Sequence, residues 1–411
     1  MLQPPVPGLA RSTFAALRHR NYRLWFTGQL VSLLGSWMQI TAQGFLVYQL
    51  TGSSIWLGTV TFAAGMPAWL FMLWGGAVAD RVPRRTLLLV TQAAMILPAS
   101  TLALLTFFDV VEAWHVAGLA FVTGVINAFD APARQAFVPE LVERGDLTNA
   151  IALNSTMFNS ATALGPAMAG LAYTAWGPAW CFAINAASYL ASLAALGLML
   201  LPAPPPPRRS RAVPVEILEG IRFVAGHPDM RVLVGFVVLL SLFGISFSTL
   251  FPAWAVSVLH GDASTHGFLQ SSRGAGALLG ALFLAAVSRT IPRGRLLVAG
   301  TLLLPLAALV FAGVRQLPLA AAALLATGVG LILVLNLCNA LLQSLSPDPL
   351  RGRVMSIYTL AFFGFMPLGG LLAGVLAAHL GEPAAVVLCA GVFLAAALAG
   401  RLLLPRLARL E

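Results

Sequence analysis

The chain is dominated by apolar blocks of about 20 residues, the length that an α-helix needs to cross roughly 30 Å of hydrocarbon. It has 59% hydrophobic and only 9% charged residues, whereas soluble domains carry roughly 25% charge. A large soluble helical protein would need charged outer faces, which these blocks lack. We therefore predict an all-α membrane protein with twelve transmembrane helices, over residues 24–50, 55–79, 86–108, 113–136, 149–173, 178–201, 230–259, 266–288, 296–314, 318–342, 354–379 and 383–404.

Several residues recur at a fixed distance along the chain. An offset of 208 residues separates Arg81 from Arg289, Gln135 from Gln343 and Pro139 from Pro347. A fixed offset near half the chain length indicates duplicated halves, which in a membrane transporter enclose a central substrate path. We expect an N-terminal six-helix half, a cytoplasmic linker and a C-terminal six-helix half, over residues 1–201, 202–229 and 230–411.

The expected linker opens with prolines between Pro202 and Pro207 and continues with arginines. Proline lacks an amide hydrogen and fixes φ, so this run is expected to be extended. The following stretch, 215–223, has apolar residues at helical spacing with charges opposite them, and predicts a helix along the cytoplasmic face. Such a helix is either a latch that follows the movement of the halves or a solvated linker.

The positive charge is carried by arginine alone, and its placement predicts the orientation of the bundle. The net charge is +10, and every arginine except Arg273 and Arg315 falls on one side of the predicted bundle. Because positively charged loops stay in the cytoplasm, we expect both termini and the linker inside. The basic residues are dispersed over many connections, so we expect no nucleic-acid partner.

The connection after the second block gathers a carboxylate and three arginines, Asp80, Arg81, Arg84 and Arg85. Such groups at a helix end can form charge-assisted hydrogen bonds between helices. We expect Asp80 and Arg81 to close the cytoplasmic side in one conformation and to separate in the other, and protonation of the carboxylate would weaken their pairing. Arg84 is a further candidate for this gate, but Arg84 and Arg85 can also be topology anchors only.

A second pair of opposite charges, Asp130 and Arg134, lies four residues apart on one helical face, a spacing that allows the two side chains to pair. Pro132 between them is expected to bend the fourth block at its inner end. The pair forms either a second gate or a static structural contact. Arg351 and Arg353, after the tenth block, have the same two interpretations.

Several stretches resemble one family of membrane transporters. The loop 76–85 resembles the loop 2–3 signature of the major facilitator superfamily, with Pro83 where a glycine usually stands. The stretch 164–170, with Gly165 and Pro166, resembles the Gly-Pro motif of its antiporter branch. The similarity to the transmembrane secretion effector group of this superfamily rests on three further stretches, 17–25, 129–135 and 347–355.

This resemblance covers essentially the whole chain and implies export by alternating access, driven by the proton gradient without a cofactor. It implies a multi-pass protein of the bacterial cytoplasmic membrane, and it does not identify a substrate. In the antiporter branch the kink at Gly165 and Pro166 is thought to limit leak during turnover. A plain packing kink is the alternative, because proline frees a carbonyl and glycine admits close helix contact in any membrane bundle.

Polar side chains on one helical face predict the wall of a central cavity. The first block carries such a stripe over four turns: Gln29, Ser32, Ser36, Gln39 and Gln43. The stripe should face a cavity or other helices rather than lipid, and its length favours the cavity. Other candidates are polar or aromatic residues that either bond and pack between helices or line the cavity: Asn154, Asn159, Phe247, Asn336, Asn339, Tyr358 and Phe362.

Arg273 is a charge inside the eighth block, roughly 10 Å from its outer end at 1.5 Å per residue. An arginine there is costly facing lipid, so it should face the cavity, pair, or reach outward. Asp262, in the preceding external loop, is the rival partner. A cavity position would favour an anionic substrate such as a siderophore.

No block has an acidic residue in its middle, the usual carrier of a coupled proton, so proton coupling depends on the resemblance. The sequence has no phosphate-binding loop and no metal-ligand spacing, and we predict no enzymatic activity. We predict an exporter of a siderophore-like or amphiphilic small molecule that works as a monomer among membrane lipids. A nutrient importer, a lysophospholipid flippase and a non-transporting membrane sensor are the alternatives.

Overall fold

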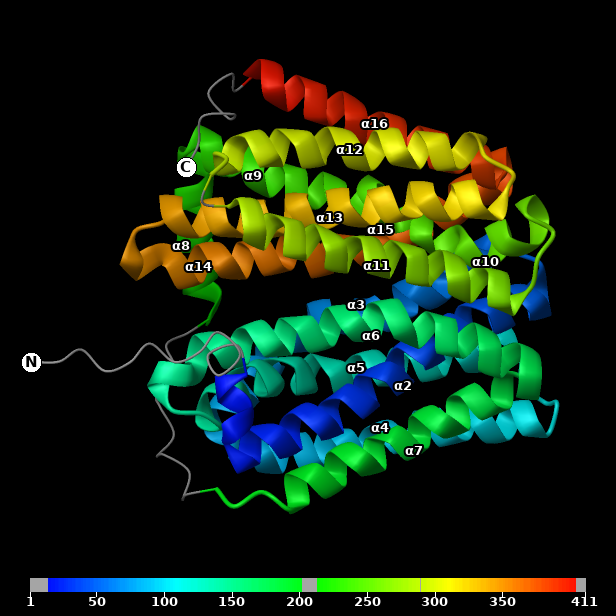
Figure 1. Ribbon diagram of the computed structural model, residues 1–411, viewed down its shortest axis with the longest axis horizontal. Helices are drawn as coiled ribbons and strands as arrows, with labels where there is room; N and C mark the ends of the chain where they lie inside the picture. The colour runs from blue at the N-terminus through cyan, green and yellow to red at the C-terminus, as the bar shows by residue number, and fades with distance from the viewer. Residues whose placement is uncertain (1–13, 202–212, 289, 404–411) are drawn as a thin grey trace, which may run out of the picture.

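The computed structural model describes residues 14–201, 213–288 and 290–403, in which every regular element is a helix. The helices form two groups side by side, which we call the first half and the second half (Figure 1). The first half contains η1 (Ala15–Arg18), α2 (Arg20–Thr51), α3 (Ser54–Arg81), α4 (Arg84–Phe107), α5 (Ala113–Phe137), η2 (Val138–Glu140), η3 (Arg144–Asp146), α6 (Leu147–Trp176) and α7 (Pro178–Gly197). The second half contains α9 (Pro228–Leu239), η4 (Leu240–Gly244), η5 (Ser246–Leu250), α10 (Phe251–Ala253), η6 (Trp254–Val258), α11 (Ala263–Val287), α12 (Arg293–Gly313), α13 (Leu317–Leu345), α14 (Asp348–Thr359), η7 (Leu360–Gly364), α15 (Phe365–Leu380) and α16 (Glu382–Leu403).

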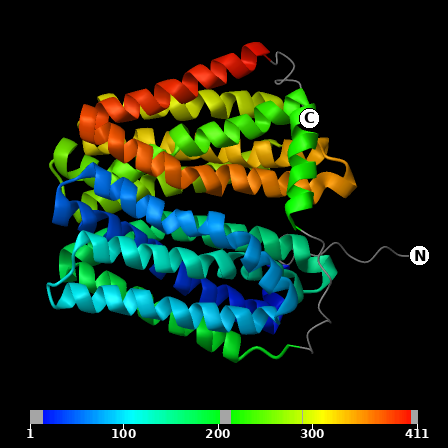
Figure 2. The same cartoon turned by 180° about the vertical axis from the view of Figure 1, so that it is seen from behind.

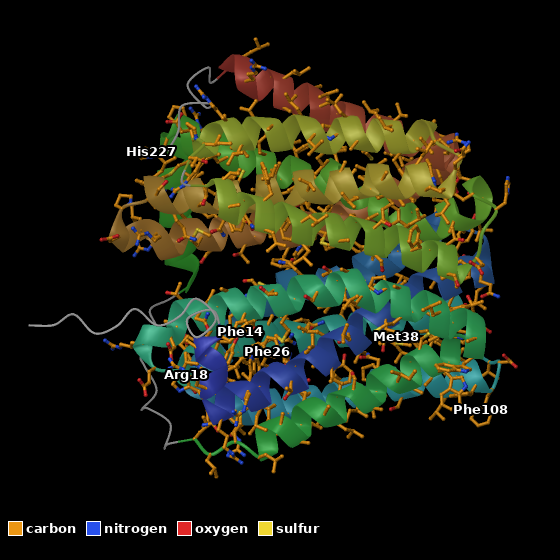
Figure 3. The ribbon with its side chains drawn as sticks, in the orientation of Figure 1. Phe14, Arg18, Phe26, Met38, Phe108 and His227 are labelled. Carbon is orange, nitrogen blue, oxygen red and sulfur yellow. The ribbon has the colours of Figure 1, made fainter. Side chains whose placement is uncertain are left out.

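The two ends of the bundle differ in charge. We call the end with the connections at 82–83, 138–146 and 346–347 the arginine-rich end, and the other end, with those at 52–53, 177 and 259–262, the opposite end. Figure 3 shows Arg18 and His227 at the first and Phe108 at the second. The helix α8 (Val213–Gly226) lies across the arginine-rich end, at a steep angle to the long helices (Figure 2), and contacts α14 and α9.

Ten segments of the described chain are long and apolar enough to cross a membrane. The other two predicted spans coincide with α6 and α11, of 30 and 25 residues. These helices are long enough, but their mean hydropathy is lower than that of the ten segments. Both contain runs of polar residues and pack against each other between the halves. Contact with a neighbouring helix removes the need for a lipid-facing apolar surface on that side.

The seventh and eleventh predicted spans are not regular helices. The seventh passes from α9 through the π-helical turn η4, the 3-10 turn η5 and α10 into a second π-helical turn, η6. The eleventh passes from α14 through the π-helical turn η7 into α15. The turns η4 and η7 end at Gly244 and Gly364, and they contact each other in the second half. Such turns are often found at functional sites.

Candidate functional site

The halves meet along two helix pairs, and the first of these is α6 with α11. A Cβ atom added to Gly267 would lie 2.4 Å from the carbonyl oxygen of Pro166. One added to Gly274 would lie 2.4 Å from the carbonyl oxygen of Thr162. Distances this short leave room only for hydrogen, so glycine on α11 allows the two backbones to touch.

The second pair, α3 with α15, is built in the same way. A Cβ atom on Gly374 would lie 2.4 Å from the Ser54 carbonyl oxygen, and one on Gly58 would lie 2.9 Å from the Gly370 carbonyl oxygen. All four residues lie in the parts of α3 and α15 near the opposite end. The face of α15 that carries Gly370 and Gly374 therefore packs against the first half.

Polar and aromatic contacts join the halves at the same end. The Ser54 hydroxyl donates a hydrogen bond of 3.1 Å to Glu382, and the hydroxyls of Thr174 and Ser264 are 2.8 Å apart. The buried ring of His266, on α11, stacks on Phe45 of α2 with centroids 6.1 Å apart. Together with the glycine contacts, these interactions close the opposite end.

The predicted Gly-Pro motif lies inside this closure. Gly165 is buried against α2, where an added Cβ atom would lie 2.6 Å from the Cβ of Trp37. Pro166 has no amide hydrogen, so the carbonyl of Thr162, four residues earlier, lacks its helical partner. That carbonyl faces Gly274 of the other half. The kink thus contributes directly to the contact between the halves.

At the arginine-rich end, Asp80 and Arg81 are exposed at the end of α3, and neither makes a hydrogen bond or ion pair within the described residues. The structure does not bring them together as a closed gate. Arg84 forms an ion pair with Glu140 of η2, both partly exposed. Arg85 donates to the carbonyls of the last turn of α7, Leu196 at 2.8 Å and Gly197 at 2.9 Å. A cation at that place also opposes the negative end of the helix dipole.

Asp130 is the centre of a buried polar cluster. Its carboxylate is fully buried and pairs with Arg134, whose Nε donates at 3.0 Å. It also accepts hydrogen bonds from Thr91 at 2.7 Å and Gln92 at 3.0 Å, both on α4. A buried carboxylate needs such a complete set of donors. The expected pairing of Asp130 with Arg134 is therefore present within α5, and the bonds from Thr91 and Gln92 connect α4 with α5.

The corresponding arginines of the second half are arranged differently. Arg351 pairs with Asp348 within α14, with an N–O distance of 2.6 Å, and is about half exposed. Arg353 lies against α8, where a Cβ atom on Gly220 would lie 3.2 Å from the Arg353 carbonyl oxygen. Arg353 thus belongs to the contact between α8 and the second half.

The polar stripe on α2 does not line an open cavity in this structure. Gln29 and Gln39 are buried and Ser36 is partly buried, all facing α7, while Gln43 is half-buried. The contacts to α7 are Gln29 with Ser192 (3.4 Å), Ser36 with Tyr189 (3.3 Å) and Gln39 with Asn185 (2.6 Å). The stripe bonds helices within the first half, which was the alternative to the cavity position.

The aromatic candidates also pack between helices. Phe247 is only 2% exposed and contacts the rings of Phe251 and Phe311, so it belongs to the core of the second half. The hydroxyl of Tyr358 donates to the Leu335 carbonyl oxygen at 3.1 Å. Phe362 is half-buried in η7, beside the same half's core.

The amide candidates are more accessible. Asn336 is exposed on α13, and Asn339, one turn later, accepts a hydrogen bond of 2.6 Å from Gln343. Asn154 and Asn159 are half-buried on α6, and the buried side-chain oxygen of Asn154 has no partner within the described residues. These positions on α6 and α13 leave donors and acceptors free for a ligand.

Arg273 faces the interior of the second half. Its guanidinium lies 5.9 Å from the centroid of the Phe251 ring and donates to Gln270 at 3.3 Å, while its Nε is buried without a partner. It borders a narrow void with Phe247 that has no room for a water molecule. The expected rival Asp262 caps α11 instead, accepting from the Thr265 amide at 3.0 Å. Arg273 has no acidic partner among the described residues.

Comparison of the sequence with known proteins identifies its family. Residues 11–410 match the transmembrane secretion effector family. The chain belongs to this family. It is a membrane transporter of the major facilitator superfamily and not an enzyme. Within the described ranges, no three His, Cys, Asp or Glu side chains are grouped so that they could hold a metal ion.

Three relatives of this family member match along most of its length. The staphyloferrin A transporter of Staphylococcus aureus is 26% identical, covering 86% of this chain and 89% of its own. The multidrug efflux pump Tap of Mycolicibacterium fortuitum is 29% identical, covering 84% and 86%. The enterobactin exporter EntS of Escherichia coli is 26% identical, covering 88% and 86%.

Solved structures share the fold. A POT family transporter crystallised with 5-aminolevulinic acid superposes with a TM-score of 0.75 at 12% identity, covering 94% of this chain and 96% of its own. A bacterial homologue of the human lysosomal transporter Spinster superposes with a TM-score of 0.68 at 13% identity, covering 95% and 96%.

Several contacts of this secretion effector family member were not predicted from the sequence. Glu140, Thr91 and Gln92 hold the charged groups at the arginine-rich end, and Glu382 bonds across the halves. Glu140 had a visible signal, because it follows the repeated Gln-x-x-x-Pro motif. Nothing in the sequence connects Glu382 with Ser54, which are 328 residues apart.

Proposed function

We propose that this protein exports a siderophore-like or amphiphilic small molecule across the bacterial inner membrane by alternating access of its two halves. The observation that carries the proposal is the match to the transmembrane secretion effector family over residues 11–410. Named relatives include an enterobactin exporter and a multidrug efflux pump. Each chain contains both halves, so a monomer suffices for transport.

The arginine-rich end is the cytoplasmic end in this proposal, because positively charged connections stay inside. The described conformation is then closed toward the outside by α6–α11 and α3–α15. Asp80 and Arg81 are exposed at the inner end and have no partner within the described residues, and they are the groups that pair when that end closes. The gate on α3 therefore works in the conformation opposite to this one.

Proton coupling is part of the proposal. Two buried side chains of the described chain can exchange a proton: Asp130, in the cluster between α4 and α5, and His266, between the halves. Each is enclosed by other helices, so proton uptake requires those helices to separate. That requirement links protonation to the conformational change.

The substrate class follows from Arg273. Within the described residues it is a cation without an acidic partner; it projects from α11 toward the ring of Phe251, and its Nε has no partner. In a conformation that opens the void beside it, an anionic group of the substrate, as a siderophore provides, would satisfy it. The amides of Asn154 and Asn159 on α6 and of Asn336 on α13 supply further hydrogen-bond donors and acceptors on the path.

The test is efflux of a catecholate siderophore and of a fluorescent cationic drug from cells, with and without a proton uncoupler. We expect siderophore export that stops with the uncoupler and falls about tenfold or more in Arg273→Ala, the loss of roughly one charge-assisted hydrogen bond. Export of the cationic drug alone would give Arg273 a structural role and make the protein a multidrug pump. Uncoupler-insensitive movement would refute proton coupling, and inward movement would make the protein an importer.

A further inference from the structure

A cavity of about 390 Å³ lies at the arginine-rich end of the second half, away from the contact between the halves. It is formed by the start of α12, the end of α13 and the start of α14. Its wall is Arg293, Asn339, Ala340, Gln343, Ser344 and Arg351. The volume is within the range of small-ligand pockets, and five of these six side chains are polar.

The cavity carries net positive charge. Arg293 is half-buried and, within the described residues, makes no hydrogen bond or ion pair. Arg351 pairs with Asp348, but the Asp348 side chain is 86% exposed and lies outside the cavity wall. The Arg293 guanidinium thus has no counter-charge within the described residues. The Arg351 guanidinium is only partly neutralised, because an ion pair with a solvent-exposed carboxylate is weak.

The internal repeat shows that this charge belongs to the second half only. At the offset of 208 residues, the counterparts in the first half of Asn339, Ser344 and Arg351 are Ala131, Ala136 and Glu143. Two polar positions are alanine there, and one arginine is an acid.

Within the described residues, Arg293 lacks the partners that the equivalent arginine of the first half has. Its counterpart Arg85 is bonded to the end of α7, and the neighbouring Arg84 pairs with Glu140. The position equivalent to Arg84 is Pro292, and the acid equivalent to Glu140, Asp348, pairs with Arg351 within α14. Within the described residues, this corner of the second half has no counterpart of the Arg84–Glu140 ion pair.

We propose that this cavity binds a phosphate group, with Arg293 and Arg351 as its cationic contacts and the amides of Asn339 and Gln343 as further donors. Arginine matches phosphate geometry better than any other side chain. Phosphate reaches this end of a membrane protein either as the headgroup of an anionic phospholipid or as a soluble phosphate ester.

The test titrates the purified full-length protein in detergent with phosphatidylglycerol, with zwitterionic phosphatidylcholine and with sn-glycerol 3-phosphate, and follows the melting temperature. We expect phosphatidylglycerol to stabilise the protein more than phosphatidylcholine, and Arg293→Gln to weaken its apparent affinity about fivefold, the effect of about one arginine near a membrane surface. Arg295→Gln is the matched control, since Arg295 is exposed on the same turn and outside the cavity wall.

A second variant guards against misfolding of the first. Gln343→Glu places a carboxylate in the cavity at an exposed position and should produce the same loss. If glycerol 3-phosphate alone stabilises the protein and Arg293→Gln removes that effect, the site stands with a soluble ligand. The proposal fails if Arg293→Gln and Arg295→Gln weaken the affinity for phosphatidylglycerol equally, or if neither phosphatidylglycerol nor sn-glycerol 3-phosphate stabilises the protein more than zwitterionic phosphatidylcholine.

Discussion

Asp130 is a buried carboxylate that holds together side chains from two helices. Its carboxylate has no exposed surface and is satisfied by Thr91 and Gln92 of α4 and by Arg134 of its own helix. A buried ion pair adds little net stability, yet removing one partner leaves the other without compensation. The same side chain therefore holds the cluster together, and in the function proposed above it is a candidate for proton exchange.

Asp130→Asn keeps the size of the side chain but removes its charge. We expect the free energy of unfolding in detergent to fall by about 1–3 kcal/mol, because Arg134 loses its counter-ion and the cluster loses acceptors. The control is Arg84→Gln, which breaks an ion pair whose partners are about 30% exposed and should change stability by less than about 1 kcal/mol. Equal losses in the two variants would show that burial of Asp130 has no energetic consequence.

At the scale of helices, the glycines of α11 and α15 decide how the halves fit. Backbone-to-carbonyl contacts at Gly267, Gly274 and Gly374 leave no space for a side chain. Glycine is unfavourable in helix interiors by roughly 1 kcal/mol relative to alanine, and here close approach compensates for that cost. Glycines of the same chain that face open space have no such role.

Gly267→Ala should push α11 away from α6, because the new Cβ atom would lie 2.4 Å from a carbonyl oxygen. We expect about 1–3 kcal/mol of strain in the closed contact, a loss of export, and faster thiol labelling of a cysteine placed at Ser264. Gly118→Ala is the control, since nothing lies within 4 Å of its added Cβ. Unchanged labelling and transport in Gly267→Ala would rule out the glycine contact as part of the gate.

At the scale of the whole molecule, the halves are closed at one end and linked at the other by the segment that leads into α8. Closure uses mainly α6 with α11 and α3 with α15, together with contacts from α2, α10, η5 and η7 and the hydrogen bond of Glu382 on α16. Most contacts of the remaining helices lie within their own half. This division allows the halves to move as units while few contacts are exchanged.

A cysteine pair at Thr174 and Ser264, in a chain whose three native cysteines are replaced by alanine, should lock that closure. The two hydroxyls are 2.8 Å apart, close enough for a disulfide after substitution. We expect oxidation to stop export and a reductant to restore it, with each single cysteine variant insensitive to oxidant. Full export by the crosslinked protein would exclude opening at this end.

Some expectations could be derived from the chain itself because the bilayer leaves few choices. Backbone amides in hydrocarbon must bond internally, so a long apolar block is a helix. The blocks at α4 and α12 follow this rule directly. The irregular course from α9 to η6 was not predictable from local composition; in the structure, η4 contacts η7 of the eleventh predicted span.

The amino-acid sequence by itself determined the class of protein, the family and the pairing of Asp130 with Arg134, because these depend on block length, local spacing and motif. Only the tertiary structure decided which way polar faces point. A stripe such as Gln29 to Gln39 must avoid lipid, but helical periodicity is identical whether it meets a cavity or, as here, α7. The contact of Ser54 with Glu382 likewise arises from packing between segments far apart in the chain.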